Sequence, residues 1–119
     1  MAEKQIVRPI KKKVTMTFRT SADILKEVDA RVILDGYGFH GKSHWISDSI
    51  ENLLKMPNFW ELVDIAVEQV DVGKAVNITI TPDLKRKIEA AVLEVRKHYP
   101  GMEGVKSNII RASINQRLI

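Results

Sequence analysis

Clustered lysines and arginines are the residues of this sequence best suited to chemistry, and that chemistry is the binding of a polyanion. Of 119 residues, 19 are basic and 15 are acidic, which gives a net charge of +4. Residues 1–20 hold six bases and one acid, residues 74–119 hold nine bases and four acids, and residues 57–73 hold four acids and no base. Two basic segments around an acidic one favour a polyanion-binding surface, with an ordinary solvated surface as the alternative.

Other kinds of chemistry have little support in the residue types present. The absence of cysteine excludes a disulfide scaffold, a thiolate metal site and a cysteine nucleophile, and fits a cytoplasmic location. His40 and His44 straddle Gly41 instead of sharing a helix face, and His98 is distant, so we predict no metal and no cofactor. No phosphate-binding glycine loop is present, which argues against an enzyme. No apolar run is long enough to span a membrane, and no membrane partner is expected.

The elements that must position the basic residues occur twice along the chain. Residues 14–24 match residues 74–84 without gaps, at an offset of 60, and apolar residues correspond to apolar residues. The segment 42–50 recurs at 106–114 with an offset of 64, so the second copy has a loop four residues longer. Self-similarity of this kind indicates one architecture built from two units.

Each copy opens with a strand that leads into a helix. Apolar and polar residues alternate over 14–20 and over 74–80, which is the pattern of a half-buried β-strand. At Ser21 and at Thr81 the apolar period changes to about 3.6 residues, the period of a helix, and hydroxyl side chains commonly cap helices. The sequence therefore predicts a strand followed by a capped helix in each copy.

A glycine-bearing turn and a second helix complete each copy. The second helices are predicted to begin at Ser43 and at Ser107. A unit of about 45 residues buries too little apolar surface to be stable alone, and a lone strand leaves its backbone unpaired. We therefore expect a mainly α fold with a two-stranded antiparallel β-ribbon, in which residues 12–56 and 74–119 share one core.

This double pattern resembles the ribbon-helix-helix DNA-binding family of the Arc/MetJ type. The resemblance rests on the alternating strand, the capped first helix, the glycine-bearing turn and the sequence Lys-Ser-x-x-Ile at the second helix, each found twice in the same order. Most members are dimers of one repeat, whereas this chain carries two. The resemblance thus implies a tandem ribbon-helix-helix pseudo-dimer that binds double-stranded DNA. It implies a transcriptional regulator, with a relaxosome or plasmid-partition role and an antitoxin-like protein-binding role as alternatives.

In that family the outward side chains of the paired strands enter the DNA major groove. The base contacts implied here are Thr15, Thr17, Arg19, Asn77 and Thr79. Arginine suits guanine and asparagine suits adenine, so Arg19 and Asn77 are the strongest candidates. We expect Arg19 to read guanine in one half of the DNA site and Asn77 to read adenine in the other, so that the site lacks strict two-fold symmetry.

Phosphate contacts are expected from the second helices and from the N-terminal arm. In the family the starts of the second helices hold the DNA backbone, because unpaired N–H groups and the helix dipole attract anions. Residues 1–11 form a basic arm that we expect to be flexible in the absence of DNA. The predicted phosphate contacts are Lys11, Lys12, Lys13, Lys42, Ser43, Lys106 and Ser107.

Residues 57–73 belong to neither copy. Asn58 and Glu61 have capping-box spacing ahead of an apolar stripe, which predicts a linker helix that carries the chain from the first copy to the second. Because its charges are all acidic, contact with DNA is not expected. Apolar surface left uncovered on this helix would allow self-association through residues 57–73.

Overall fold

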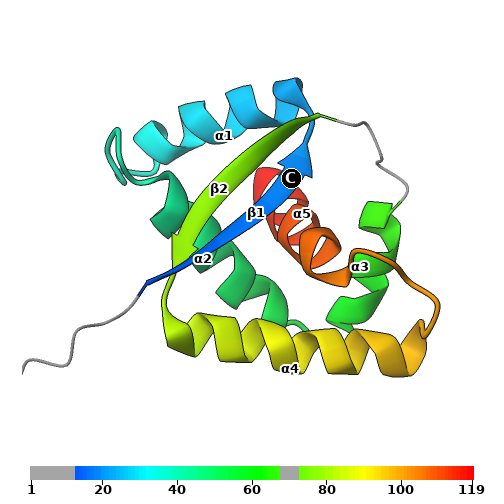
Figure 1. Cartoon of the computed structure of the whole chain (residues 1–119). Coiled ribbons are helices and arrows are strands. Elements are labelled where there is room, and N and C mark those ends of the chain that lie inside the picture. The colour runs from blue at the N-terminus through cyan, green and yellow to red at the C-terminus, as the bar shows by residue number, and fades with distance from the viewer. Residues whose placement is uncertain (1–12, 68–72) are drawn as a thin grey trace, which may run out of the picture.

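The computed structural model describes residues 13–67 and 73–119, which form five helices and a two-stranded antiparallel sheet (Figure 1). The elements follow in the order β1 (Val14–Thr20), α1 (Ala22–Leu34), α2 (Lys42–Leu54), α3 (Phe59–Val67), β2 (Lys74–Ile80), α4 (Pro82–His98) and α5 (Val105–Leu118). The predicted mainly helical class with an antiparallel ribbon is therefore confirmed. Among the described residues, none of the helices has the length and apolar character needed to cross a membrane.

The ribbon is paired along its whole length. Its register runs from Val14 opposite Ile80 to Thr20 opposite Lys74. Because successive strand residues point to opposite faces, one face of the ribbon packs on the helices while the other is exposed. On the packed face Phe18 and Ile80 are buried. The sequence alternation therefore predicted correctly which face is apolar.

The helices that directly follow the strands are capped as the sequence predicted. The Ile24 N–H donates to Ser21 Oγ at 3.2 Å, and the Leu84 N–H donates to Thr81 Oγ1 at 3.1 Å. Both capping residues have extended backbone conformations, which lets a side-chain oxygen turn back to the first helical turn. Since the strands are antiparallel, α1 and α4 leave the ribbon at its opposite ends (Figure 1).

The second helices begin earlier than the sequence suggested. α2 begins at Lys42 and α5 at Val105, so the predicted starts at Ser43 and Ser107 were wrong by one and two residues. Glycines stand at both cap positions, where no side chain can mark the boundary. At the first of them, Gly41, an added Cβ would lie 2.4 Å from the Tyr37 carbonyl oxygen, so only glycine fits.

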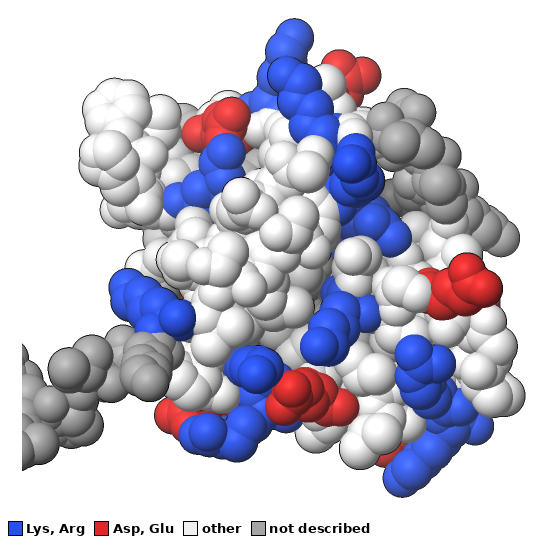
Figure 2. Space-filling view, in the orientation of Figure 1, with Lys and Arg blue, Asp and Glu red and all other residues white. Residues whose placement is uncertain are grey.

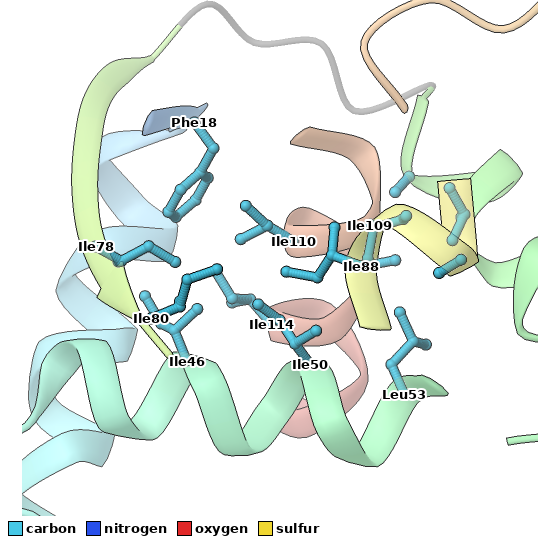
Figure 3. Close-up of a cluster of buried hydrophobic side chains, with 14 of the residues drawn as sticks. Phe18, Ile46, Ile50, Leu53, Ile78, Ile80, Ile88, Ile109, Ile110 and Ile114 are labelled. Atoms are coloured by element: carbon cyan, nitrogen blue, oxygen red, sulfur yellow. The ribbon is translucent and has the colours of Figure 1, made fainter. Parts of the chain in front are cut away.

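The core lies between the ribbon and the helices, and isoleucine is the commonest of its buried apolar residues in the described part of the chain (Figure 3). α2 packs against α5, while α2 also contacts β2 and α5 also contacts β1. Protein interiors are packed to crystal-like density, so removing or adding even one methylene group in this core changes the stability of the fold. The side chains that meet at the centre are Phe18, Ile46, Ile50, Ile78, Ile80, Ile88, Ile109, Ile110 and Ile114.

The segment predicted as a linker helix contributes to the core. Within residues 57–73 the structure describes α3, whose residues Phe59, Val63 and Ala66 are buried. α3 packs against α5 and α4, so this helix closes one side of the fold besides connecting the two strands. Residues 68–72, at the end of the predicted segment, lie outside the described residues. Self-association through this segment stays a prediction.

A polar network around Arg117 ties the last helix to the loop before α2. The Arg117 guanidinium donates to the Trp45 carbonyl oxygen at 2.9 Å and to Ser49 Oγ at 3.1 Å. It also donates to the Tyr37 hydroxyl at 3.0 Å and lies 4.5 Å from the Trp45 ring centroid. Trp45 is fully buried, and its Nε1 donates to Asp35 Oδ2 at 2.8 Å. This network fixes the start of α2 relative to α5.

Candidate nucleic-acid interface

The exposed face of the ribbon carries the residues that we predicted from the sequence as base contacts. Those residues are Thr15, Thr17, Arg19, Asn77 and Thr79, and all five are exposed. The register pairs outward residues with outward residues, so they share one surface. Neither strand contains an acid. Figure 2 shows a largely uncharged area at the centre of this view, with basic side chains around it.

The ribbon face has three levels that differ in chemistry. Thr15 lies opposite Thr79 at one end, Thr17 opposite Asn77 in the middle and Arg19 opposite Ala75 at the other end. Asn77 is therefore central. Strand pairing brings Asn77 to the middle of the face and Arg19 to one end, so the two do not lie at opposite ends of the ribbon. The expectation that they read opposite halves of a DNA site stays a prediction.

Two hydrogen bonds orient the polar groups of this face. Thr17 Oγ1 donates to Asn77 Oδ1 at 2.6 Å, which fixes the orientation of the amide and leaves its NH₂ group pointing to other partners. Arg19 Nη1 donates to the Gly73 carbonyl oxygen at 3.0 Å. A guanidinium has five N–H donors, so this one bond positions the Arg19 side chain and leaves further N–H groups that can donate to another partner.

The starts of α2 and α5 differ from those of α1 and α4. α1 and α4 each have a side-chain cap and an acid in the first turn, Asp23 and Asp83. α2 and α5 have neither. The first N–H groups of any helix lack partners within the helix, and at these two starts neither a side-chain cap nor a first-turn acid offsets the positive end of the helix dipole. That is the electrostatic setting in which an anion binds.

Ser43 links the start of α2 to the ribbon. Its Oγ accepts the Thr79 N–H at 3.0 Å, so the side chain bonds to β2 and makes no cap for its own helix. The hydroxyl hydrogen stays available to donate. Lys42, beside it, forms an exposed ion pair with Asp29, with 3.1 Å between Nζ and Oδ1. Because these partners are far apart in sequence, the pattern alone did not reveal either contact.

Arg111 makes the comparable link between α5 and the other strand. Its Nη1 donates to the Arg19 carbonyl oxygen at 2.8 Å, and its Nη2 donates to Asn108 Oδ1. Burial lowers the pKa of the Arg111 guanidinium from its ordinary value, yet arginine keeps its charge in proteins. Lys106 is exposed and Ser107 half-buried in the first turn of α5. The sequence missed Arg111, although it lies one turn beyond Ser107.

Further basic residues surround the ribbon face. Lys13 is exposed beside the start of β1, and the predicted contacts Lys11 and Lys12 lie outside the described residues. Lys74 is exposed at the start of β2, and Lys85 lines a hollow beside β1. The sequence analysis did not predict the last two as contacts, because their places beside the ribbon face follow from the fold and not from a local sequence pattern.

Comparison with protein-family models, with curated proteins and with solved structures finds no match to this chain. Within residues 13–67 and 73–119, no three histidine, aspartate or glutamate side chains are grouped to hold a metal ion.

Proposed function

We propose that this chain is a tandem ribbon-helix-helix protein that binds double-stranded DNA in a sequence-specific manner. The observation that carries the proposal is the acid-free polar ribbon face held next to two uncapped, acid-free helix starts. The ribbon face would supply base contacts and the helix starts would supply phosphate contacts, which are the two classes that specific DNA recognition requires.

The dimensions of the ribbon suit the major groove. Paired strands lie about 4.8 Å apart, and the major groove of B-form DNA is about 12 Å wide and admits a two-stranded ribbon. Each base pair presents a distinct set of donors and acceptors there. Arg19 can donate twice to guanine, and the Asn77 amide can donate to and accept from adenine, while threonine hydroxyls adapt to either role.

Correspondences between the two sequence copies support the tandem arrangement. Both strands are seven residues long and 60 residues apart, and the central pair, Thr17 and Asn77, consists of corresponding residues. The capping residues Ser21 and Thr81 have φ and ψ of −70° and 154°, and of −77° and 156°. α2 contacts β2 and α5 contacts β1, so each copy covers the strand of the other.

We further propose that the protein acts as a transcriptional repressor, by covering promoter DNA. A relaxosome or plasmid-partition protein would use the same contacts. A map of the sites bound in the genome separates the roles, because promoter sites favour repression, whereas clustered sites at a single transfer or partition locus favour the alternatives.

Selection of bound sequences from random duplex DNA tests the proposed function. The wild-type chain should enrich a defined motif, and Arg19→Ala should lose a guanine preference within it. Arg96→Ala is the matched control, because Arg96 is an exposed arginine at the far end of α4 and its loss changes the net charge equally. A wild-type chain that enriches no motif and binds no duplex would contradict the proposal.

A further inference from the structure

The two uncapped helix starts have matching sequences but different charge surroundings. Lys42 and Lys106 correspond in the two copies, as do Asp29 and Glu89. Lys42 is paired with Asp29, with 3.1 Å between Nζ and Oδ1. Glu89 is instead approached by Lys85, whose Nζ lies 3.9 Å from its Oε2, one helical turn away. Among the described residues no acid forms an ion pair with Lys106.

One position at which the two copies differ in sequence explains why the two lysines have different ion pairs. Lys85 corresponds to Leu25 in the first copy, so only the second copy has a cation there. Without such a lysine, Asp29 pairs with Lys42, whereas Glu89 pairs with Lys85 and leaves Lys106 uncompensated.

Lys85 and Lys106 line one hollow beside the ribbon. This β1-side hollow has a volume of about 120 Å³, and its walls come from β1, α4 and α5. Its charged lining residues are Lys85, Lys106 and Glu89, so positive charge exceeds negative by one. Thr15, on the exposed ribbon face, belongs to the same lining.

The hollow on the other edge of the ribbon has no excess of positive charge. This β2-side hollow, of about 390 Å³, contains Ser43 and Thr79. Its charged lining residues are Lys13, Asp48 and Glu51, and Glu51 is paired with Lys87 of α4 at 2.9 Å, which leaves one lysine and one acid in balance. The two edges of the ribbon therefore present different fields to an anion.

We propose that Lys85 and Lys106 together bind one DNA phosphate at the β1-side hollow, which makes this edge the stronger of two unequal backbone contacts. This inference rests on the proposed DNA-binding function. A phosphate group carries one negative charge along the backbone, and the β1-side hollow has one uncompensated lysine to neutralise it. Because the Lys42–Asp29 pair is already neutral, phosphate binding at the α2 start has to compete with Asp29.

The dependence of duplex affinity on salt tests the inference. Each phosphate neutralised by a protein cation contributes about 0.9 to the slope of log affinity against log salt. Lys85→Gln and Lys106→Gln should each lower that slope by up to about 0.9 and weaken binding to all duplexes alike. Lys42→Gln should lower it less, and Lys85→Arg should restore the wild-type slope because it restores the charge.

Lys97→Gln is the matched control, because this lysine lies in the last turn of the same helix, lines neither hollow and pairs with Glu94 at 3.5 Å. Its slope should equal that of the wild type. Glu89→Gln should strengthen duplex binding several-fold at low salt, since it removes the acid from the hollow. A Lys85→Gln slope equal to that of Lys97→Gln, or a larger loss for Lys42→Gln than for Lys106→Gln, would overturn the inference. A wild-type chain that binds no duplex would instead remove the proposed function itself.

Discussion

Replacing Asn77 by alanine is expected to remove base preference at the middle of the DNA site, while replacing Arg19 removes it at one end only. Asn77 lies at the central level of the ribbon, opposite Thr17. Arg19 lies two residues beyond Thr17 on β1, opposite Ala75. At about 3.4 Å per residue the two levels are roughly 7 Å apart. Base pairs also rise by about 3.4 Å, so the adenine and guanine preferences should lie about two base pairs apart.

The size of each loss follows from the contacts available to the side chain. A bidentate contact of asparagine with adenine or of arginine with guanine contributes about 1–3 kcal/mol of discrimination, roughly 5- to 150-fold. Thr17→Val should give a smaller effect at the position read by Asn77. It removes the hydroxyl that donates to Asn77 Oδ1 at 2.6 Å, and a net hydrogen bond contributes about 0.5–1.5 kcal/mol, roughly 2- to 13-fold.

The assay has two stages, selection from random duplex DNA with the wild type and the three variants, then anisotropy titrations on matched duplexes at one salt concentration. The expected motif has guanine preference on one side only, because the counterpart of Arg19 in the second copy is Thr79. Equal guanine preference on both sides would refute the reasoning. So would an Asn77→Ala motif identical to that of the wild type.

Three further predictions concern assembly and stability. Sedimentation at low micromolar concentration should show a folded monomer, because both ribbon strands belong to one chain; folding only as a dimer, with fragments 1–56 and 74–119 each forming homodimers, would contradict this. Ile50→Ala should lower the free energy of unfolding in urea by about 2–5 kcal/mol, since Ile50 is fully buried, whereas Ile33→Ala, on the surface, should change it by less than about 1 kcal/mol. Arg117→Lys should lower the same free energy by about 1–3 kcal/mol and alter tryptophan fluorescence, because lysine cannot form the forked bonds or stack on Trp45; unchanged unfolding and fluorescence would show that the network is dispensable.

The parts of this fold that the sequence predicted are those fixed by local chemistry. Alternation over 14–20 and 74–80 identified both strands and their buried faces, because side-chain direction in a strand has a period of two. Ser21 and Thr81 marked the following helices, because a hydroxyl cap bonds to an N–H three residues later. These signals depend on neighbours in the chain and need no knowledge of the packing.

The contacts that organise the candidate site escaped prediction because they join distant segments. Ser43 bonds to Thr79, 36 residues away, and Arg111 bonds to the Arg19 carbonyl, 92 residues away. Which of several polar side chains makes such a bond depends on how α2 and α5 cross the ribbon, and one sequence does not specify that geometry. The central position of Asn77 likewise follows from the strand register, which is set by pairing across 60 residues.

The pairing of β1 with β2 inside a single chain makes formation of the ribbon a first-order process. For a ribbon shared between two separate chains, dilution separates the strands and the folded fraction depends on protein concentration. Here the strands are tethered, and each meets the other at an effective concentration set by the connecting chain. The cost of closing that connection grows only with the logarithm of its length. The ribbon therefore assembles within one molecule, and its folded fraction does not depend on how many copies of the protein a cell holds.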